Sequence, residues 1–175
     1  MSRMTRSRLV LLDANIVIQL FELELWDQLI ARFDIVLAQT VVDESDHYRD
    51  DDFAIEIDLQ PYIDSQAIAV HELEPSRINA YCARFDASYL EKLDPGEAES
   101  LCLLDEDADT LMCSADKIVW RVLGNLGIGD RGISLEEMLG QAGQTTNLRR
   151  QFTKTFRQEW TKKGFAEGMM GQGAQ

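Results

Sequence analysis

The sequence contains a run of four apolar residues, Leu9 to Leu12, which stops abruptly at a carboxylate in Leu-Val-Leu-Leu-Asp-Ala-Asn. A short apolar run without alternation is typical of a strand that is buried on both faces. Asp13 therefore falls at the carboxyl end of a predicted inner strand, where open α/β sheets bind their ligands. An Asp in this place can equally serve as the cap of the next helix.

Further strands and helices are predicted to alternate along the chain. Apolar runs at 35–38, 67–73 and 110–113 predict three more strands, and periodic or capped segments predict helices at 16–21, 23–33, 76–85, 117–126 and 133–139. Another helix is expected to begin at Asp94, whereas the acidic stretch 46–52 is expected to be a solvated helix end or loop. This alternation predicts an α/β fold of three layers, α/β/α, around a central and mostly parallel sheet.

Further acids follow or flank these elements. Glu44 lies in Thr-Val-Val-Asp-Glu, Glu97 and Glu99 lie in Asp-Pro-Gly-Glu-Ala-Glu, and Asp116 lies in Cys-Ser-Ala-Asp-Lys. Helix-start signals alone can account for Glu97 and Asp116. On a helical wheel Glu97 falls beside the buried face and Glu99 points mostly away, so Glu97 is the better candidate for a central cleft and Glu99 the second.

These motifs, in this order and spacing, resemble those of the PIN-domain family of metal-dependent nucleases, which includes the VapC-type toxins, over roughly residues 9–139. The resemblance implies a strand at the sheet edge near 67–73, an RNA substrate and a site that holds Mg²⁺ or Mn²⁺. It implies Asp13 and Asp116 as principal ligands, with Glu97 and Glu44 completing the catalytic site and Glu99 as an alternative ligand. Asn15 and Ser114 would orient ligands or a phosphate. A toxin of this kind would have an antitoxin protein as a partner.

Elementary electrostatics agrees with a metal site if the acids do converge. Four carboxylates in a small pocket raise one another's pKa and destabilise the fold unless a counterion is present. A hard divalent cation with oxygen ligands resolves the conflict, and such ions activate water and stabilise the leaving oxygen in phosphodiester cleavage. His47, about one helical turn beyond Glu44, is either part of the same cleft or a surface histidine.

Charge is distributed unevenly along the chain of 175 residues, whose net charge is -14. From Asn147 onward six Lys and Arg stand against two acids, a net charge of +4, which leaves -18 on the first 146 residues. We therefore separate a nuclease-like domain, 1–143, from a basic C-terminal part, 144–175, with a disordered end from Gly164. Arg149, Arg150, Lys154 and Arg157 are expected to contact RNA phosphates. Alternatively, this part packs on the acidic body or on a second subunit, as in a homodimer.

Composition narrows the remaining function classes. No apolar stretch is long enough to span a bilayer and no secretory core follows the N-terminus, so we expect a cytoplasmic protein. Cys82, Cys102 and Cys113 are expected to be reduced thiols. Two alternatives to the nuclease are a fold of this kind that only binds or regulates, and a Mg²⁺-dependent phosphatase. The phosphatase is the less favoured alternative, because this sequence lacks the Asp-x-Asp nucleophile motif that commonly follows a strand in such enzymes.

Overall fold

A computed structural model describes residues 8–175. Its ten α-helices within this range are α1 (Ala14–Glu22), α2 (Trp26–Ile30), α3 (Gln39–Glu44), α4 (Gln60–Asp64), α5 (Pro75–Cys82), α6 (Ala87–Leu90), α7 (Pro95–Glu106), α8 (Lys117–Asn125), α9 (Leu135–Gln141) and α10 (Lys154–Met169). The strands there are β1 (Leu9–Leu12), β2 (Asp34–Ala38), β3 (His47–Asp50), β4 (Phe53–Glu56), β5 (Ile68–His71) and β6 (Leu111–Cys113). Two 3₁₀ turns, Gly129–Arg131 and Arg150–Phe152, complete the description.

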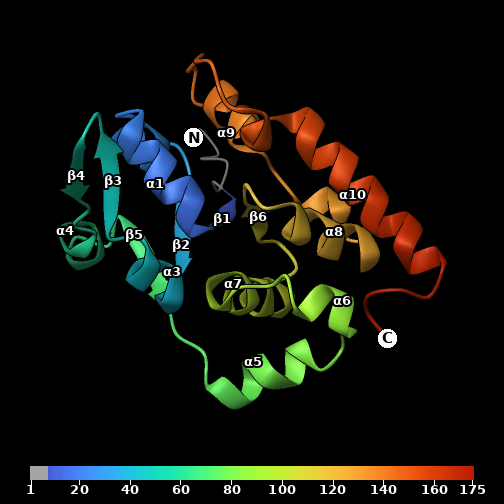
Figure 1. Ribbon diagram of the computed structural model, residues 1–175. Helices are drawn as coiled ribbons and strands as arrows, with labels where there is room; N and C mark the ends of the chain where they lie inside the picture. Colours follow the sequence, from blue (N-terminus) through green and yellow to red (C-terminus); the bar gives the residue numbers. More distant parts are fainter. Residues whose placement is uncertain (1–7) are drawn as a thin grey trace, which may run out of the picture.

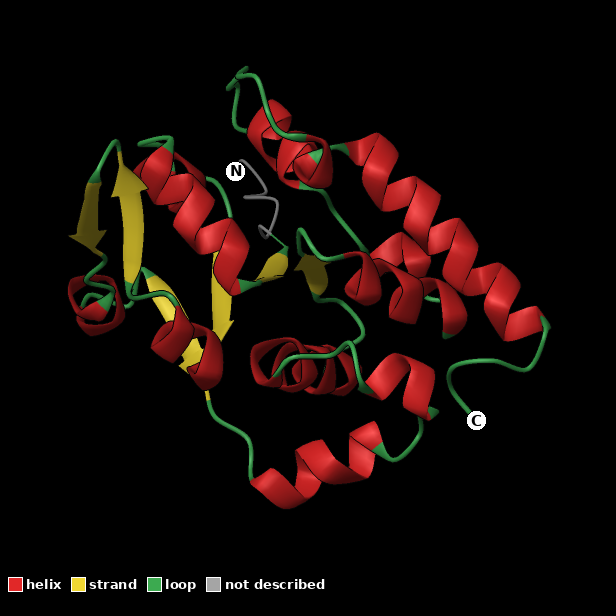
Figure 2. Ribbon diagram, viewed as in Figure 1, coloured by secondary structure: helices red, strands yellow, loops and turns green. Residues whose placement is uncertain are grey.

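Four parallel strands form the central sheet in the order β5-β2-β1-β6, with helices on both faces (Figures 1 and 2). Val10 and Leu12 pack with α1, α2 and α9 on one face, whereas Leu11 packs with α5, α7 and α8 on the other. This alternation on β1 explains the unbroken apolar run in the sequence, because both faces of the strand are buried. The predicted three-layer α/β/α architecture is confirmed, and β5 lies at the sheet edge as expected.

The acidic stretch 46–52 is not a loop or helix end. It contributes β3, which pairs with β4 in a separate antiparallel ribbon whose turn contains Asp51 at a φ of 51°. Tyr48 of β3 stacks on Phe21 of α1 with ring centroids 6.3 Å apart. The prediction failed because it relied on the acidic side chains, which face solvent. The aromatic contact with α1, which stabilises the strand, is not visible in the local sequence.

The C-terminal end is ordered, contrary to the expectation of a disordered tail from Gly164. Helix α10 continues to Met169 and packs lengthwise on α8 (Figure 1). The last residues are then tied to the chain before α6, since the Asp86 N–H donates to the Gly173 carbonyl at 2.8 Å and the Gln175 N–H to the Arg84 carbonyl at 2.7 Å. Phe156 and Trp160 pack against the α8 side of the core, so the basic C-terminal part does pack on the body.

Several local predictions need smaller corrections. Asp13 caps α1, which begins at Ala14 and not at the predicted residue 16, and α2 is confined to the middle of the predicted 23–33 helix. Helix α5 ends at Cys82, before the predicted Phe85. The three cysteines are free thiols, as expected. No helix in residues 8–175 is both long enough and apolar enough to cross a membrane.

Candidate carboxylate site

Asp13 and Ser114 meet where β1 and β6 end side by side in the sheet. The Asp13 N–H extends the ladder by donating to the Cys113 carbonyl at 3.0 Å, which sets the two chain ends in register. The Ser114 hydroxyl then donates to Asp13 Oδ2 at 3.0 Å, and the Ala14 N–H donates to Asp13 Oδ1 at 2.8 Å. Asp13 is 2% exposed, so the end of the central strand carries a buried carboxylate in a fixed orientation.

Asp116 joins this pair through the same serine. Its N–H donates to the Ser114 hydroxyl oxygen at 3.0 Å, while its own carboxylate caps α8 by accepting from the Ile118 N–H at 3.0 Å. Asp116 is therefore a helix cap that also lies within electrostatic range of Asp13.

Glu97 reaches the same place from the first turn of α7. The capping box expected from the sequence is present, with the Glu97 N–H donating to Asp94 Oδ1 at 2.8 Å and the Asp94 N–H to Glu97 Oε2 at 3.1 Å. The second oxygen, Oε1, is buried without a hydrogen-bond partner among the described residues. An unpartnered buried carboxylate oxygen is unfavourable unless a ligand completes it.

The pKa values of the two buried acids are raised mainly by burial and further by the neighbouring carboxylates. Burial, opposed by the hydrogen bond from Ser114, raises the pKa of Asp13 to about 7, and the charges of Asp94 and Asp116 contribute. Burial, followed by the charges of Asp13 and Asp116, raises the pKa of Glu97 to about 9. Asp94 was considered in the sequence only as a cap, yet its charge acts on both groups. The sequence could have indicated this, because Asp94 stands at the start of the helix that carries Glu97.

Glu44 and Glu99 lie apart from this trio, although Glu99 belongs to α7 and Glu44 packs against its first turn. Glu44 is exposed and packs against the start of α7, where burial and then the charge of Asp94 raise its pKa. A Cβ on Gly96 would come within 2.6 Å of Glu44 Oε2, so this glycine makes room for the carboxylate.

Both oxygens of Glu99 are already occupied. Its Oε2 accepts from the Thr40 N–H at 3.0 Å and from the Thr40 hydroxyl at 2.6 Å, and its Oε1 accepts from the Leu73 N–H at 2.8 Å. These hydrogen bonds hold the pKa of Glu99 below its ordinary value despite burial. Glu99 thus fastens the ends of β2 and β5 to α7.

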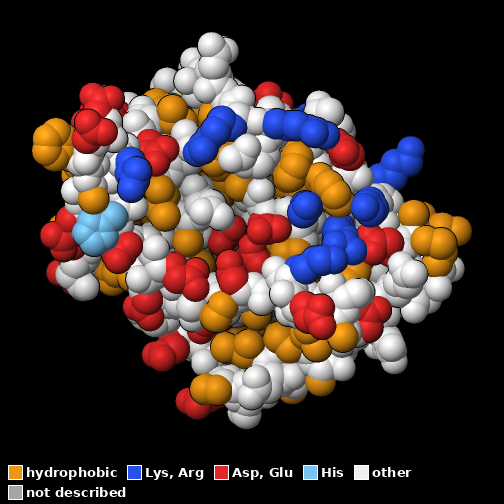
Figure 3. Space-filling view, viewed as in Figure 1, with side chains coloured by type: hydrophobic (Ala, Val, Ile, Leu, Met, Phe, Trp, Pro, Cys, Tyr) orange, Lys and Arg blue, Asp and Glu red, His pale blue; other side chains and the backbone are white. Residues whose placement is uncertain are grey.

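The remaining sequence candidates occupy different surroundings. Asn15 is exposed on the first turn of α1, two residues beyond Asp13. His47 is exposed on β3, where its Nδ1 lies 3.2 Å from Asp46 Oδ2. Acidic side chains gather in the middle of the face drawn in Figure 3, with Lys and Arg side chains around its upper and right margins.

The four basic residues expected to contact RNA differ in how strongly other side chains of the protein already bind them. Arg157 makes two hydrogen bonds to Glu137 at 2.8 and 2.9 Å, in a pair whose side chains are 13% and 23% exposed. Arg150 pairs with Glu159 at 2.7 Å on the surface, and the Lys154 side chain is exposed. Arg149 Nη2 donates to Gln19 Oε1 at 2.8 Å. Arg157 thus serves mainly to hold α10 on α9.

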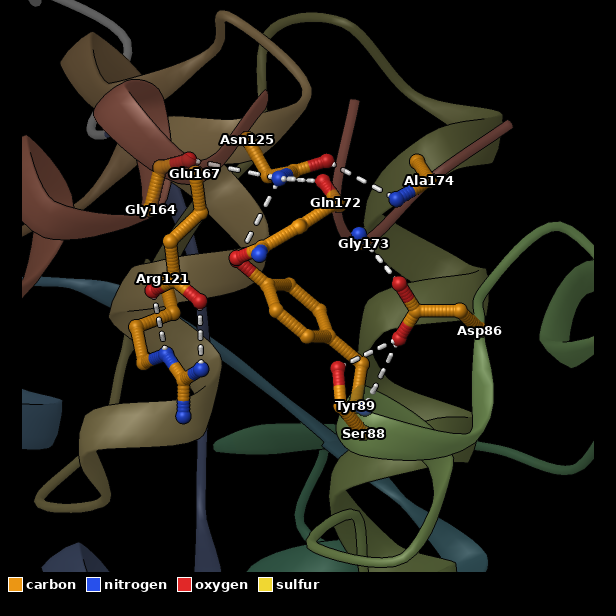
Figure 4. A network of polar contacts seen from close by, with 10 residues as sticks. All are labelled: Asp86, Ser88, Tyr89, Arg121, Asn125, Gly164, Glu167, Gln172, Gly173 and Ala174. Atoms are coloured by element: carbon orange, nitrogen blue, oxygen red, sulfur yellow. Dashed lines mark hydrogen bonds and ion pairs between the residues drawn. The ribbon is translucent and has the colours of Figure 1, made fainter. Parts of the chain in front are cut away.

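A second buried polar cluster, between α8 and α10, was missed in the sequence (Figure 4). Arg121 and Glu167 make two hydrogen bonds, at 2.9 and 2.6 Å, and Asn125 binds Tyr89, Gly164, Gln172 and Ala174. Its members are far apart in sequence and no local motif marks them. Every labelled charge in this cluster has a partner, so it reads as structural.

No combination of three or more His, Cys, Asp or Glu side chains within residues 8–175 already has the mutual geometry of a metal site. Asp13, Glu97 and Asp116 thus act on one another electrostatically, but their side chains are not arranged as metal ligands are. A scan against protein-family models and a search of characterised proteins both give no match to this chain, so the carboxylate site is the main guide to function.

Proposed function

We propose that this protein is a metal-dependent endoribonuclease of the PIN type. The observation that carries the proposal is the convergence of Asp13, Glu97 and Asp116, delivered by three separate elements, with one buried Glu97 oxygen lacking any partner. Such crowding costs stability in a protein without a ligand at this site. A cation bound at the site would offset this cost.

The donor set fits a hard divalent cation. The trio offers only carboxylate oxygens, which suit Mg²⁺ or Mn²⁺ better than softer metals. Glu97 Oε1 is available at once, whereas each Asp13 oxygen already accepts one hydrogen bond and keeps a further lone pair. Asp116 is only half-buried, so its carboxylate can swing toward the other two. Binding would need this adjustment, since the trio lacks a ready-made ligand geometry.

In this proposal the protein groups divide the work. A bound divalent cation supplies the activation of water and the stabilisation of the leaving oxygen. Asp13 and Glu97 give up their protons to become ligands, and Asp116 completes the set. Ser114 fixes the orientation of Asp13 while accepting from the Asp116 N–H, which couples the two strand ends. Glu44, on the outer margin beside Gly96, is placed to bind through water.

RNA would reach this acidic site along its basic margin. Arg149, Arg150 and Lys154 offer exposed positive charge, whereas Arg157 is largely engaged by Glu137. Phosphate contacts of this kind weaken steeply with salt. As part of the proposal the protein acts in the cytoplasm as a homodimer, with an antitoxin protein controlling it. Growth arrest on expression, relieved by Asp13→Asn, would support the toxin role.

The test is cleavage of a labelled single-stranded RNA with Mn²⁺, Mg²⁺ or EDTA. Asp13→Asn and Asp116→Asn are expected to lower the rate by at least about a hundredfold, because each removes a metal-binding charge. Glu91→Gln, an exposed acid on the turn after α6, is the matched control and should cleave normally. Equal cleavage by all four purified proteins would mean a contaminating nuclease and would contradict the proposal.

A binding or regulatory module is the second candidate, favoured by the lack of a ready-made ligand geometry within the described chain. Such a module would bind RNA or a protein at the same face without cleaving. RNA binding that persists in EDTA, together with no metal-dependent cleavage under any condition, would favour it over the nuclease.

A further inference from the structure

A polar pocket of about 310 Å³ is lined by residues of α1 and of the chain that leads from α9 to α10. Asn15, two residues beyond Asp13, and Ala115, which precedes Asp116, both line it. The pocket therefore adjoins the two strand ends that carry the acids. Its volume is at the lower end of the range for small-molecule sites, which suits a unit the size of one nucleotide.

The pocket presents polar groups that suit a nucleotide. Its main polar and aromatic lining residues are Asn15, Gln19, Glu22, Arg149, Gln151 and Phe152. Amide side chains can both donate and accept, which matches the edges of nucleobases, and a carboxylate can accept from their amino groups. A guanidinium matches a phosphate. Donors, acceptors and one positive charge are thus gathered in a single cavity.

Arg149 is held ready in this pocket by two contacts. Gln19, only 8% exposed, accepts from Arg149 Nη2 at 2.8 Å through its Oε1. The Arg149 guanidinium carbon also lies 5.4 Å from the centroid of the Phe152 ring. A buried amide on one side and an aromatic ring on the other restrict the arginine before any ligand arrives, which lowers the entropic cost of binding.

Arg150, the next residue, makes a useful contrast. It carries the same charge but lies outside the pocket lining and pairs with Glu159 on the surface. The two arginines therefore differ in their surroundings, since Arg149 contacts Gln19 and Phe152 in the pocket whereas Arg150 contacts Glu159 on the surface.

We propose that this pocket binds the nucleotide of single-stranded RNA that lies next to the phosphate at the carboxylate trio, with Arg149 on a phosphate and the amides on the base. The inference rests on the proposed nuclease function and adds its substrate subsite. It assigns base preference to Gln19, Asn15 and Gln151. Gln19 has two tasks, because it positions Arg149 and lines the pocket.

The experiment measures the binding of fluorescent eight-nucleotide RNAs, oligo(A), oligo(C) and oligo(U), to the full chain in EDTA, where metal-dependent cleavage is absent. Arg149→Ala and Gln19→Met are expected to weaken the preferred RNA by about tenfold or more, the loss of one charge-assisted contact. Gln19→Met should also reduce the difference among the three RNAs. Arg150→Ala should weaken all three by only about two- to threefold, through lost long-range attraction.

Arg77→Ala, on α5 and far from the pocket, is the control for unchanged binding, and thermal unfolding of each variant checks that it is folded. Wild-type protein that binds no RNA, or Arg149→Ala that binds as wild type does, overturns the subsite. Arg149-dependent binding without any Mn²⁺-dependent cleavage keeps the subsite and removes the nuclease function. Metal-dependent cleavage that is unaffected by Arg149→Ala and Gln19→Met keeps the nuclease function and removes the subsite.

Discussion

Two of the places where the molecule buries charge treat it in opposite ways. Between α8 and α10, Arg121 and Glu167 neutralise each other through two hydrogen bonds, and the Asn125 amide is fully used (Figure 4). At the ends of β1 and β6, carboxylates of like charge meet and a Glu97 oxygen has no partner in the described chain. Complete pairing is typical of a structural contact, whereas crowded like charges with an unpartnered carboxylate oxygen support the proposal that a ligand binds there.

The first prediction breaks the paired region. Glu167→Ala should lower the free energy of unfolding by about 3–5 kcal/mol, because it leaves the Arg121 guanidinium buried without a counterion. Glu159→Ala is the matched control on the same helix, since its pair with Arg150 is exposed, and it should cost less than about 1 kcal/mol. Urea unfolding of both variants measures the difference, and equal losses would show that the Arg121–Glu167 pair is unimportant.

The second prediction tests how closely the two helices approach. A Cβ on Gly164 would lie 2.0 Å from the Arg121 carbonyl oxygen, so Gly164→Ala should push α10 from α8 and cost about 2–3 kcal/mol. Gly140 in α9 has nothing within 4 Å of such a Cβ, and Gly140→Ala should be neutral or stabilise by up to about 1 kcal/mol. Thermal unfolding compares the two. A stabilised Gly164→Ala protein would mean that the helices are not in close contact.

The packing of α10 on α8 also makes a truncation unsuitable for testing the basic C-terminal part. Deletion after Asn147 would remove the whole of α10 and expose the face of α8 on which it packs. Loss of RNA binding in such a truncation would then report unfolding as readily as lost phosphate contacts. Single substitutions at Arg149 and Arg150 leave α10 in place and separate the two effects.

The third prediction concerns pH and the unpaired region. The pKa values of Asp13 and Glu97 are raised to about 7 and about 9 from ordinary values near 4, so the folded protein binds more protons than the unfolded chain between these limits. Stability without metal should therefore fall as pH rises from 5 toward 9. Glu97→Gln removes one of these protons, and between pH 6 and 8.5 it should gain on the order of 1–2 kcal/mol relative to wild type.

Melting temperatures across this pH range, in EDTA, provide the measurement. Glu91→Gln, which changes an exposed glutamate, should follow the wild-type curve. If wild-type stability instead rises from pH 6 to 8.5, or if Glu97→Gln runs parallel to wild type, the burial and mutual repulsion of these acids are too weak to support the interpretation of this site.

Sequence reasoning succeeded where the physical cause is local. The buried run before Asp13 predicts β1, and the capping residues Asp94 and Ser134 start α7 and α9 as expected. Asp13 and Asp116 could be placed together because strands of a parallel sheet end at one edge. Helical geometry favoured Glu97 over Glu99, but its expectation that Glu99 points mostly away from the buried face is wrong, because Glu99 is only 2% exposed.

The failures come from partners distant in sequence. The bonds of Glu99 to Thr40 and Leu73 join residues 59 and 26 positions away, which no local pattern encodes. Gly164 looks like a helix breaker because its intrinsic helix propensity is low, yet the close approach to α8 requires a glycine there. The β3–β4 ribbon was missed because its packing on α1, which includes the ring contact between Phe21 and Tyr48, joins residues far apart in sequence.

The central claim is that Asp13, Glu97 and Asp116 form an incomplete site for a divalent cation, and thermal unfolding with and without Mn²⁺ at pH 8 tests it most directly. A cation at a hundredfold excess over its Kd stabilises a folded protein by about 2.7 kcal/mol. The account predicts a higher midpoint for the wild-type chain and for Glu91→Gln, and no shift for Asp13→Asn or Asp116→Asn. A midpoint that Mn²⁺ leaves unchanged in the wild-type chain, or raises equally in all four proteins, would contradict it.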